Sequence, residues 1–469
     1  MSGEHKNNKG MAEFSRRDFL RLAGLAGVGL LMKPAWPRGD SILWAGPTFS
    51  TSSATVAVTE AFSYDRALIR QKVQHLFESI GGLSDLVGQG KRVAIKLNLT
   101  GGSGTSRHSR LQGVDIRETM WTHPEVVRAI GELLIDSGVR PSDIYIVEAL
   151  WDAASYANFG YADVQRALGA QFVDLNTAPF IQKPVGESHF RFESFVLNRI
   201  LAQIDVYVSV PKLKHHYEAG LTGALKNQIG ITPLQYYKRA STDGNRSKLH
   251  YGQDSEDVGT HLPRAICDLN LARPVHLAVI DGIKNAFGGE GAWNPTFVPA
   301  ESHVLLAGKD PVATDAVAAL LLGLNPELEQ LPLPDRVRRC DNHLELMRQC
   351  GVGTNRLAEI QVVGDGAWRV TGVETRGSGP IPDRPRLLPN YPNPFNASTA
   401  VRFEMPVPSR VELEVFNGRG RKVATLYEGW MPAGLHEIRW EARELPSGVY
   451  FCRLQSREFV DTAKLLLQK

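Results

Sequence analysis

Between residues 55 and 365, stretches typical of β-strands alternate with stretches typical of helices, and this alternation is the strongest constraint on the fold. Residues 204–210 form a continuous β-rich run, as expected for a strand covered on both faces. Residues 91–98, 143–149 and 275–280 are further strand-like runs. Strands that alternate with helices build a sheet with helices packed on it. The sequence therefore predicts an α/β domain with a largely parallel sheet.

Two helices of this domain have recognisable starts. Thr122-His123-Pro124-Glu125 has the pattern of a capping box, which makes Thr122 the expected N-cap, and apolar residues follow at helical spacing. Asp310-Pro311 predicts the start of a second helix, again followed by apolar residues.

The first 45 residues are typical of an export signal. Ser15 to Arg21 reads Ser-Arg-Arg-Asp-Phe-Leu-Arg, and the apolar, Gly-rich stretch 22–32 follows. That stretch is too short for a permanent membrane span, whereas a basic segment before a short apolar one is typical of a signal peptide. The pair Arg16-Arg17, with Phe19 and Leu20 behind it, resembles the twin-arginine motif. The resemblance implies export of the folded protein by the Tat translocase to the periplasm, with removal of residues 1–45.

A Gly- and Pro-rich linker, residues 366–387, separates the α/β domain from residues 388–469. In that last segment short runs alternate apolar and polar residues, as strands with one buried face do; they are residues 401–405, 411–416, 436–440 and 448–454. The pattern predicts a small immunoglobulin-like β-sandwich.

The same segment resembles a known family. It opens with Asn390-Tyr-Pro-Asn-Pro-Phe-Asn396, continues with Pro432-Ala-Gly434 and Leu445-Pro-Ser-Gly-Val-Tyr450, and places Lys464 in a final apolar strand. In this order the motifs resemble the type A sorting domain of the type IX secretion system. The resemblance implies passage across the outer membrane through the type IX machinery, removal of the module, and attachment to the cell surface or release.

Polar residues gather where the predicted strands end. Ligands of open α/β sheets bind beyond the carboxyl ends of the strands, so we expect one shared site there. The candidate catalytic residues are Lys212, Asp281 and Glu290. The candidate ligand-binding residues are Lys96, Asn98, Lys214, His215 and Asn227.

Most of these residues also allow a structural interpretation. Lys212 and Lys214 alternate, so both can point one way and clamp a phosphate or carboxylate, or they belong to a solvated loop. As an exposed loop residue, Lys212 is expected to contribute little to stability. Asp281 is either an acid–base group or the cap of a helix or turn.

The sequence leaves a divalent metal open. Asp281, Glu290 and Asn98 offer the oxygen ligands that magnesium or calcium prefer, and His215 would favour zinc. His215 and His216 face opposite ways on a strand, so they share one ion only in a bent loop. The four cysteines are scattered and none forms a C-x-x-C pair, which argues against an iron–sulfur cluster. Cys340 and Cys350 either pair in an oxidising compartment or are two ordinary thiols on one helix.

Several function classes are disfavoured. A formal net charge of +3 on 469 residues gives no support to nucleic-acid binding. The run Gly101-Gly-Ser-Gly104 is neither a Walker loop nor a Rossmann fingerprint, so nucleotide binding is poorly supported. The sequence also lacks the G-x-S-x-G and H-E-x-x-H patterns of common hydrolases.

The α/β domain also resembles a family, domain of unknown function 362 (DUF362), over most of residues 90–365. The matching stretches are Lys96-Leu-Asn98, Thr122 to Val127, Val208 to His215, Thr222-Gly-Ala-Leu-Lys-Asn227, Ile280-Asp-Gly282 and Gly308 to Ala316. The alternative to a ligand-binding role for Asn227 is that Thr222–Asn227 is simply a helix packed through its glycine, with Asn227 at an exposed end. Some members carry an iron–sulfur segment, whose cysteines are missing here.

Two hypotheses follow: an exported enzyme acting on a small anionic substrate, or a non-catalytic surface protein that binds an anionic ligand or a metal.

Overall fold

The computed structural model describes residues 54–100, 110–111, 114–151, 153–238, 247–250, 258–335, 338–367, 370, 384–405, 409–431, 434–456 and 459–469. The predicted signal peptide, the Gly101–Gly104 run and most of the predicted linker lie outside these residues.

A large mixed sheet forms the centre of the α/β domain. Its main path runs β17-β1-β14-β12-β9-β2-β5-β6. These strands are β17 (Ile360–Val363), β1 (Ala54–Glu60), β14 (Val304–Gly308), β12 (Leu277–Phe287), β9 (Val206–Ser209), β2 (Val93–Lys96), β5 (Ile144–Glu148) and β6 (Gln171–Asp174). β10 (Lys212–His216) pairs with β12 and with β11 (Gly220–Thr222), and β13 (Val298–Ala300) pairs with β12.

Most neighbouring strands along the main path are parallel, as predicted. β12, β9, β2, β5 and β6 run parallel in succession, and β1 is parallel to β17. β14 is the exception, because it runs antiparallel to both β1 and β12. The prediction that Asp281 ends its strand is wrong: β12 continues to Phe287, because β10 and β13 pair with its second half.

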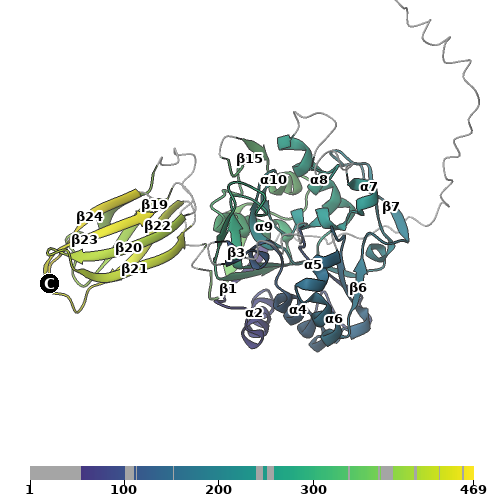
Figure 1. Ribbon diagram of the computed structural model, residues 1–469, viewed down its shortest axis with the longest axis horizontal. Helices are drawn as coiled ribbons and strands as arrows, with labels where there is room; N and C mark the ends of the chain where they lie inside the picture. The colour runs from purple at the N-terminus through teal and green to yellow at the C-terminus, as the bar shows by residue number, and fades with distance from the viewer. Residues whose placement is uncertain are drawn as a thin grey trace, which may run out of the picture. The chain divides into compact units, whose positions relative to one another are not determined.

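Helices cover both faces of this sheet (Figure 1). α2 (Arg66–Ser79), α4 (Pro124–Asp136) and α6 (Tyr161–Leu168) share one apolar core with the sheet. α8 (Val258–Ala272), α9 (Pro311–Leu321) and α10 (His343–Gln349) share another. The smaller elements are β3 (Arg110–Leu111), β4 (Val114–Asp115), α3 (Ile116–Met120), η2 (Pro141–Asp143), α5 (Ala153–Asn158), β7 (Phe180–Pro184), β8 (Ser194–Asn198), η3 (Arg199–Ala202), η4 (Lys226–Ile231), α7 (Leu234–Tyr237), β15 (Gln330–Pro332), β16 (Arg339–Asp341) and η7 (Leu357–Glu359).

The two predicted helix starts have different outcomes. Asp310 is the N-cap of α9, and its Oδ1 accepts hydrogen bonds from the backbone N–H groups of Val312 and Ala313. For α4 the N-cap is His123 and not Thr122, because Nδ1 of His123 accepts from the N–H of Glu125. The Thr122 hydroxyl is used elsewhere.

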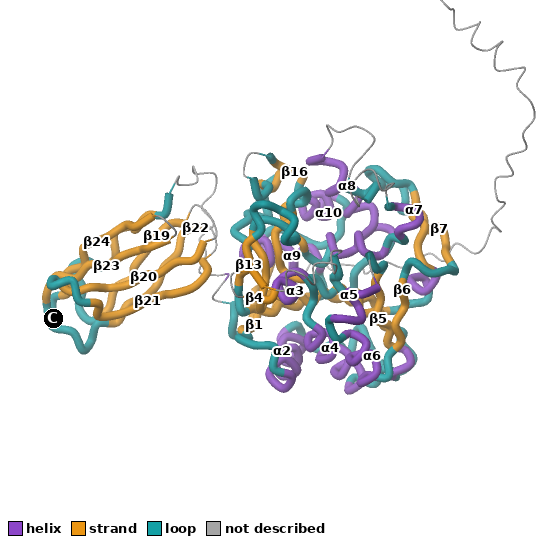
Figure 2. Tube along the Cα trace, in the orientation of Figure 1, coloured by secondary structure: helices purple, strands orange, loops and turns teal. Residues whose placement is uncertain are grey.

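The described residues between 384 and 469 form an antiparallel β-sandwich, as predicted; Figure 2 shows this part of the chain as strands and loops. One sheet is β18-β19-β22, formed by Arg386–Tyr391, Ser398–Met405 and Gly434–Glu441. The other is β21-β20-β23-β24, formed by Lys422–Met431, Ser409–Asn417, Gly448–Ser456 and Phe459–Leu467. Inward side chains such as Phe403, Val415 and Leu465 fill the space between them. β18 and β21 were not predicted.

The cysteines of the α/β domain are not arranged as expected. Cys340 lies in β16, whereas Cys350 follows the end of α10, so the expectation of two thiols on one helix is wrong. Both are free thiols in the structure. Within the part of the chain that the structure describes, no helix combines the length and apolar character needed to cross a membrane.

Candidate functional site

A buried ion pair joins two of the candidate residues. Lys212 on β10 lies opposite Asp281 on β12 in the strand register, and Nζ of Lys212 is 2.5 Å from Oδ2 of Asp281. Both side chains are 0% exposed. Tyr64 completes a triangle: Lys212 donates to its Oη over 2.9 Å, and the hydroxyl donates to Oδ1 of Asp281 over 2.8 Å. We call these three residues the inner triad. The interpretation of Lys212 as a solvated loop residue is therefore wrong, because β10 is covered on both faces.

The contacts of Asp281 favour a positioning role for it. Besides Lys212 and Tyr64, it accepts from the backbone N–H of His123 at 2.9 Å and of Ile283 at 3.3 Å. A carboxylate has about four lone-pair sites, and these donors occupy them all. Burial lowers the pKa of Lys212, and the neighbouring Asp281 carboxylate opposes that effect. The triad thus fixes β10, β12 and the start of α4 relative to one another.

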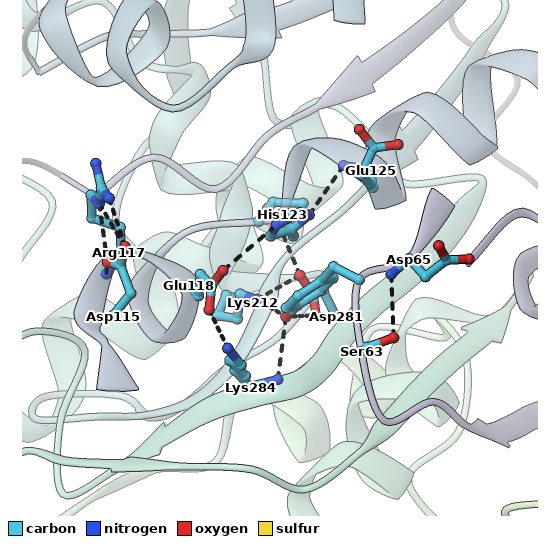
Figure 3. A network of polar contacts seen from close by, with 12 residues as sticks. Ser63, Asp65, Asp115, Arg117, Glu118, His123, Glu125, Lys212, Asp281 and Lys284 are labelled. Carbon is cyan, nitrogen blue, oxygen red and sulfur yellow. Dashed lines mark hydrogen bonds and ion pairs between the residues drawn. The ribbon is translucent and has the colours of Figure 1, made fainter. Parts of the chain in front are cut away.

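A less buried layer surrounds the inner triad (Figure 3). The ring of His123 stacks on Tyr64 with 3.7 Å between centroids, and Nε2 of His123 is 3.9 Å from Oε1 of Glu118. Glu118 also forms an ion pair with Lys284. Burial, followed by the charges of the neighbouring lysines, lowers the pKa of His123 to about 3. His123 is therefore a neutral imidazole at physiological pH.

A second buried ion pair joins neighbouring strands β2 and β5. Nζ of Lys96 is 2.8 Å from Oε1 of Glu148, and the two side chains are 1% and 2% exposed. Lys96 also donates to the carbonyl of Leu97, and the N–H of Leu99 donates to Glu148. Burial raises the pKa of Glu148 to about 7 in spite of Lys96. Gly230 packs against the pair so closely that a Cβ there would lie 2.4 Å from Oε1 of Glu148.

Asn98 and Asn227 connect this pair to η4. Oδ1 of Asn227 accepts from Nδ2 of Asn98 at 3.0 Å and from Nζ of Lys96 at 3.4 Å. Nδ2 of Asn227 donates to the hydroxyl of Ser209. Asn227 is 2% exposed, so the prediction of an exposed helix end is wrong. Oδ1 of Asn98 is buried and has no hydrogen-bond partner among the described residues.

The chain reaches Asn227 through a tight turn and not through the predicted helix. The carboxylate of Asp315, on α9, accepts from the N–H groups of Ala224 and Leu225. A Cβ on Gly223 would lie 2.3 Å from Oδ1 of Asp315, so only glycine leaves room for this contact. This explains why the stretch 222–227 needs its glycine: the turn presents Lys226 and Asn227 to the interior.

Two further lysines are buried beside the second pair. Lys214 is 0% exposed and donates to the carbonyl of Met120. Lys226 is 6% exposed, and among the described residues its ammonium group has no hydrogen-bond or ion-pair partner. Burial lowers the pKa of Lys226 to about 8, against the opposing effect of Glu290. Burial, and next the Lys226 charge, lower the pKa of Lys214 well below its ordinary value. The two ammonium groups therefore share one electrostatic environment.

Glu290 is an acid next to these lysines. Its Oε2 accepts from the N–H of Tyr217 at 3.0 Å, and its Oε1 accepts from the indole N–H of Trp293 at 3.0 Å. Nε2 of His216 is 4.0 Å from Oε2. Burial alone would raise the pKa of Glu290, but these hydrogen bonds and the charge of Lys226 lower it overall.

His215 lies away from these groups. Its Nδ1 accepts from the N–H of Gly288 at 3.1 Å, and its Nε2 donates to the carbonyl of Leu322 at 3.0 Å. His216, the next residue on β10, points toward Glu290 instead. The hypothesis of one metal shared by His215 and His216 is therefore contradicted, because both ring nitrogens of His215 already bind the protein. Across the described ranges, no group of three or more His, Cys, Asp or Glu residues is arranged to hold a metal ion.

The structure thus divides the predicted shared site into separate centres. Lys212 and Asp281 belong to the inner triad, while Lys96, Asn98 and Asn227 surround Glu148. Lys214 and Glu290 lie with Lys226, and His215 stands apart.

Sequence reasoning missed several residues of these centres. Tyr64 and Glu118 carry no local signal, because Tyr64 meets Asp281 across 217 residues of chain and Glu118 meets Lys284 across 166. Lys226 had a signal, since it precedes Asn227 in the stretch that resembles the DUF362 family.

Fold and side chains together define an α/β domain with buried charged centres near the carboxyl ends of its strands, followed by a β-sandwich. Residues 93–320 match the family described as domain of unknown function (DUF362), and residues 390–468 match the secretion system C-terminal sorting domain. The α/β domain is therefore similar to the DUF362 family over residues 93–320, and residues 390–468 are similar to a type IX sorting domain. The sorting domain supports secretion to the cell surface and implies interaction with the type IX machinery.

Among curated proteins, the thylakoid-associated protein sll1697 of Synechocystis sp. is 26% identical over 277 residues, which are 58% of this chain and 75% of that protein. The lactate racemase apoprotein of Thermoanaerobacterium thermosaccharolyticum is 12% identical over 59% of this chain and 58% of its own, with a TM-score of 0.32. PorZ, a type IX secretion component of Porphyromonas gingivalis, is 15% identical over 31% of this chain and 16% of its own, with a TM-score of 0.14. These structural similarities are too low to bear on the site.

Proposed function

We propose that this is a surface protein whose α/β domain binds a small anion between Lys214 and Lys226. The observation that carries the proposal is Lys226, which is 6% exposed and whose ammonium group has no partner among the described residues. Proteins rarely bury a charge without a counter-charge, because the desolvation penalty is several kcal/mol. A bound anion would supply that counter-charge.

The rest of the centre supports the same ligand. Lys214 gives one of its three N–H donors to Met120 and keeps two for a ligand. Glu290 has both oxygens bound by protein donors, so it does not cancel Lys226 by direct contact. The inner triad, by contrast, is saturated, and its role is to hold β10 in place.

The test is calorimetric titration of the full chain with small anions, in a buffer without carboxylate or phosphate. Wild type should bind at least one of inorganic phosphate, sulfate and acetate, and Lys226→Met should weaken that binding by at least tenfold. Lys91→Met removes an exposed lysine and is the matched control, with unchanged affinity. Equal affinities of wild type and Lys226→Met would refute the proposal.

A second candidate function is catalysis on the bound anion, favoured by Glu148. A carboxylic acid with a pKa of about 7 is suited to general acid–base work at neutral pH. Glu148→Gln should then keep anion affinity within about twofold but abolish any conversion of a bound substrate, followed by mass spectrometry. Conversion at the wild-type rate would exclude Glu148 as the acid–base group.

For the export route, we propose the Tat translocase followed by type IX secretion. The proposal is supported by the Arg16-Arg17 pair, which precedes a short apolar stretch, and by the sorting domain. Replacing both arginines with lysine should leave unprocessed precursor in the cytoplasm, as shown by cell fractionation. Deleting residues 388–469 should leave the protein in the periplasm; normal surface arrival of the shortened chain would refute the sorting role.

A further inference from the structure

Thr222 is an unused donor next to the two lysines. It lies on β11 directly opposite Lys214 on β10, so the two side chains share one face of the hairpin. Its hydroxyl is 0% exposed, and among the described residues it has no hydrogen-bond partner. Leaving a buried hydroxyl unpaired costs about 1–3 kcal/mol, so a position of this kind indicates a missing partner.

His343 is a second unused group on the same side. It is the first residue of α10, is 0% exposed, and neither Nδ1 nor Nε2 has a hydrogen-bond partner within the described ranges. Burial, and next the Lys226 charge, lower its pKa to about 3, so the ring is neutral and keeps one N–H to donate.

α8 connects His343 to the turn that carries Lys226. Cys267 on α8 contacts the His343 carbonyl, with its sulfur 3.6 Å from the oxygen. One turn further along, Nδ2 of Asn270 donates to the carbonyl of Leu225, the residue before Lys226. Because residues three apart lie on one face of a helix, α8 contacts the backbone of both segments from one face, and the Lys226 charge acts on the His343 ring.

We infer that Lys226, Thr222 and His343 form a binding site for a tetrahedral oxyanion of the phosphate type. The inference rests on the proposed anion-binding function and specifies its ligand. Each of the three side chains donates from one atom, unlike a guanidinium, which can donate from two atoms at once. The three side chains come from three different elements: η4, β11 and α10. Carboxylates are typically held in one plane by a bidentate guanidinium, and none of these three groups is one. Donors that arrive from several directions match oxygens arranged as a tetrahedron.

Burial also limits the ligand. Thr222 and His343 are fully buried and Lys226 almost so, and only a small group can reach donors that are buried to this degree. The group is either a free phosphate ion or the phosphate of a small ester, and the two share the same contacts at this site.

The test compares inorganic phosphate, sulfate, phenyl phosphate and acetate by calorimetry on the full chain. Phosphate and sulfate should bind at least tenfold more tightly than acetate. Thr222→Val and His343→Leu should each weaken phosphate binding about tenfold, the effect of one lost hydrogen bond to a charged group. Thr222→Ser keeps the hydroxyl and should restore affinity. Phenyl phosphate that binds as tightly as phosphate identifies an ester ligand, and its failure to bind identifies the free ion.

Matched controls and thermal melting separate binding from folding. Thr177→Val and His189→Leu change exposed residues of the same types and should leave affinity unchanged. If acetate binds as tightly as phosphate, or if Thr222→Val and His343→Leu bind phosphate like wild type, the oxyanion site is wrong while anion binding at Lys226 stands. If wild type binds none of the four anions, the proposed function itself fails.

Discussion

Replacing Asp281 with asparagine should strongly destabilise the α/β domain. The change keeps the shape of the side chain but removes the negative charge 2.5 Å from the Lys212 ammonium. Both groups are 0% exposed, so water cannot replace the lost partner. Breaking a buried ion pair from one side costs about 3–5 kcal/mol, because it leaves an uncompensated buried charge. At about 2–4 °C per kcal/mol for a large domain, the melting temperature should fall by roughly 10 °C.

The stability of Asp281→Asn should also depend on pH in a direction that a simple loss of packing would not produce. Asp281 opposes the lowering of the Lys212 pKa, so without it the pKa of Lys212 in the folded state falls further below its unfolded value. The unfolded state then binds more protons over that interval, and stability rises with pH. Asp281→Asn should therefore recover part of its lost stability, relative to wild type, as the pH rises toward about 10, the ordinary pKa of lysine.

The assay is guanidinium unfolding of the full chain at several pH values, followed by near-ultraviolet circular dichroism. Lys212→Met combined with Asp281→Asn is the informative second variant, because it removes both charges and should be more stable than Asp281→Asn alone. The reasoning is refuted if Asp281→Asn lowers the free energy of unfolding by less than about 1 kcal/mol. It is also refuted if the double variant is less stable than Asp281→Asn alone, because the two changes would then be additive and the charges would not interact.

Three further predictions concern Lys226 and the neighbouring Lys96–Glu148 ion pair. The pKa of Lys226 is about 8 in the folded protein, against 10.5 for an ordinary lysine, so the unfolded state binds more protons between these two values. Wild type should therefore gain on the order of 3 kcal/mol of stability between about pH 8 and 10.5, and Lys226→Met should lack this gain in the same unfolding series. Gly230→Ala places a Cβ 2.5 Å from Nζ of Lys96 and should cost about 1–3 kcal/mol, whereas Gly88→Ala, with no atom within 4 Å of the new Cβ, should be nearly neutral by thermal melting. Gly223→Ala should displace the turn before Lys226 and lower anion affinity at least tenfold in calorimetry, while an unchanged affinity would show that the turn does not position the lysine.

The sequence alone determined the class of fold, because that information is local. Strand-like runs such as 204–210 show which segments are covered on both faces, and their alternation with helical segments leaves few architectures. Asp310 was assigned correctly as an N-cap because a cap and its helix lie within four residues. The two-residue alternation near the C-terminus predicted the sandwich for the same reason, and the order of its motifs identified the sorting domain.

Only the tertiary structure decided which polar residues meet. Lys212 and Asp281 are paired by the register of two strands 69 residues apart, and register is not visible in either strand by itself. Burial of Lys226 depends on a turn fixed by Asp315, about 90 residues further along the chain. Charged and amide residues are most often exposed, so the local pattern left open a solvated loop for Lys212 and an exposed end for Asn227. Both are buried because the packing of distant elements supplies counter-charges and hydrogen bonds, which offset the free-energy cost of burying a charge or an amide.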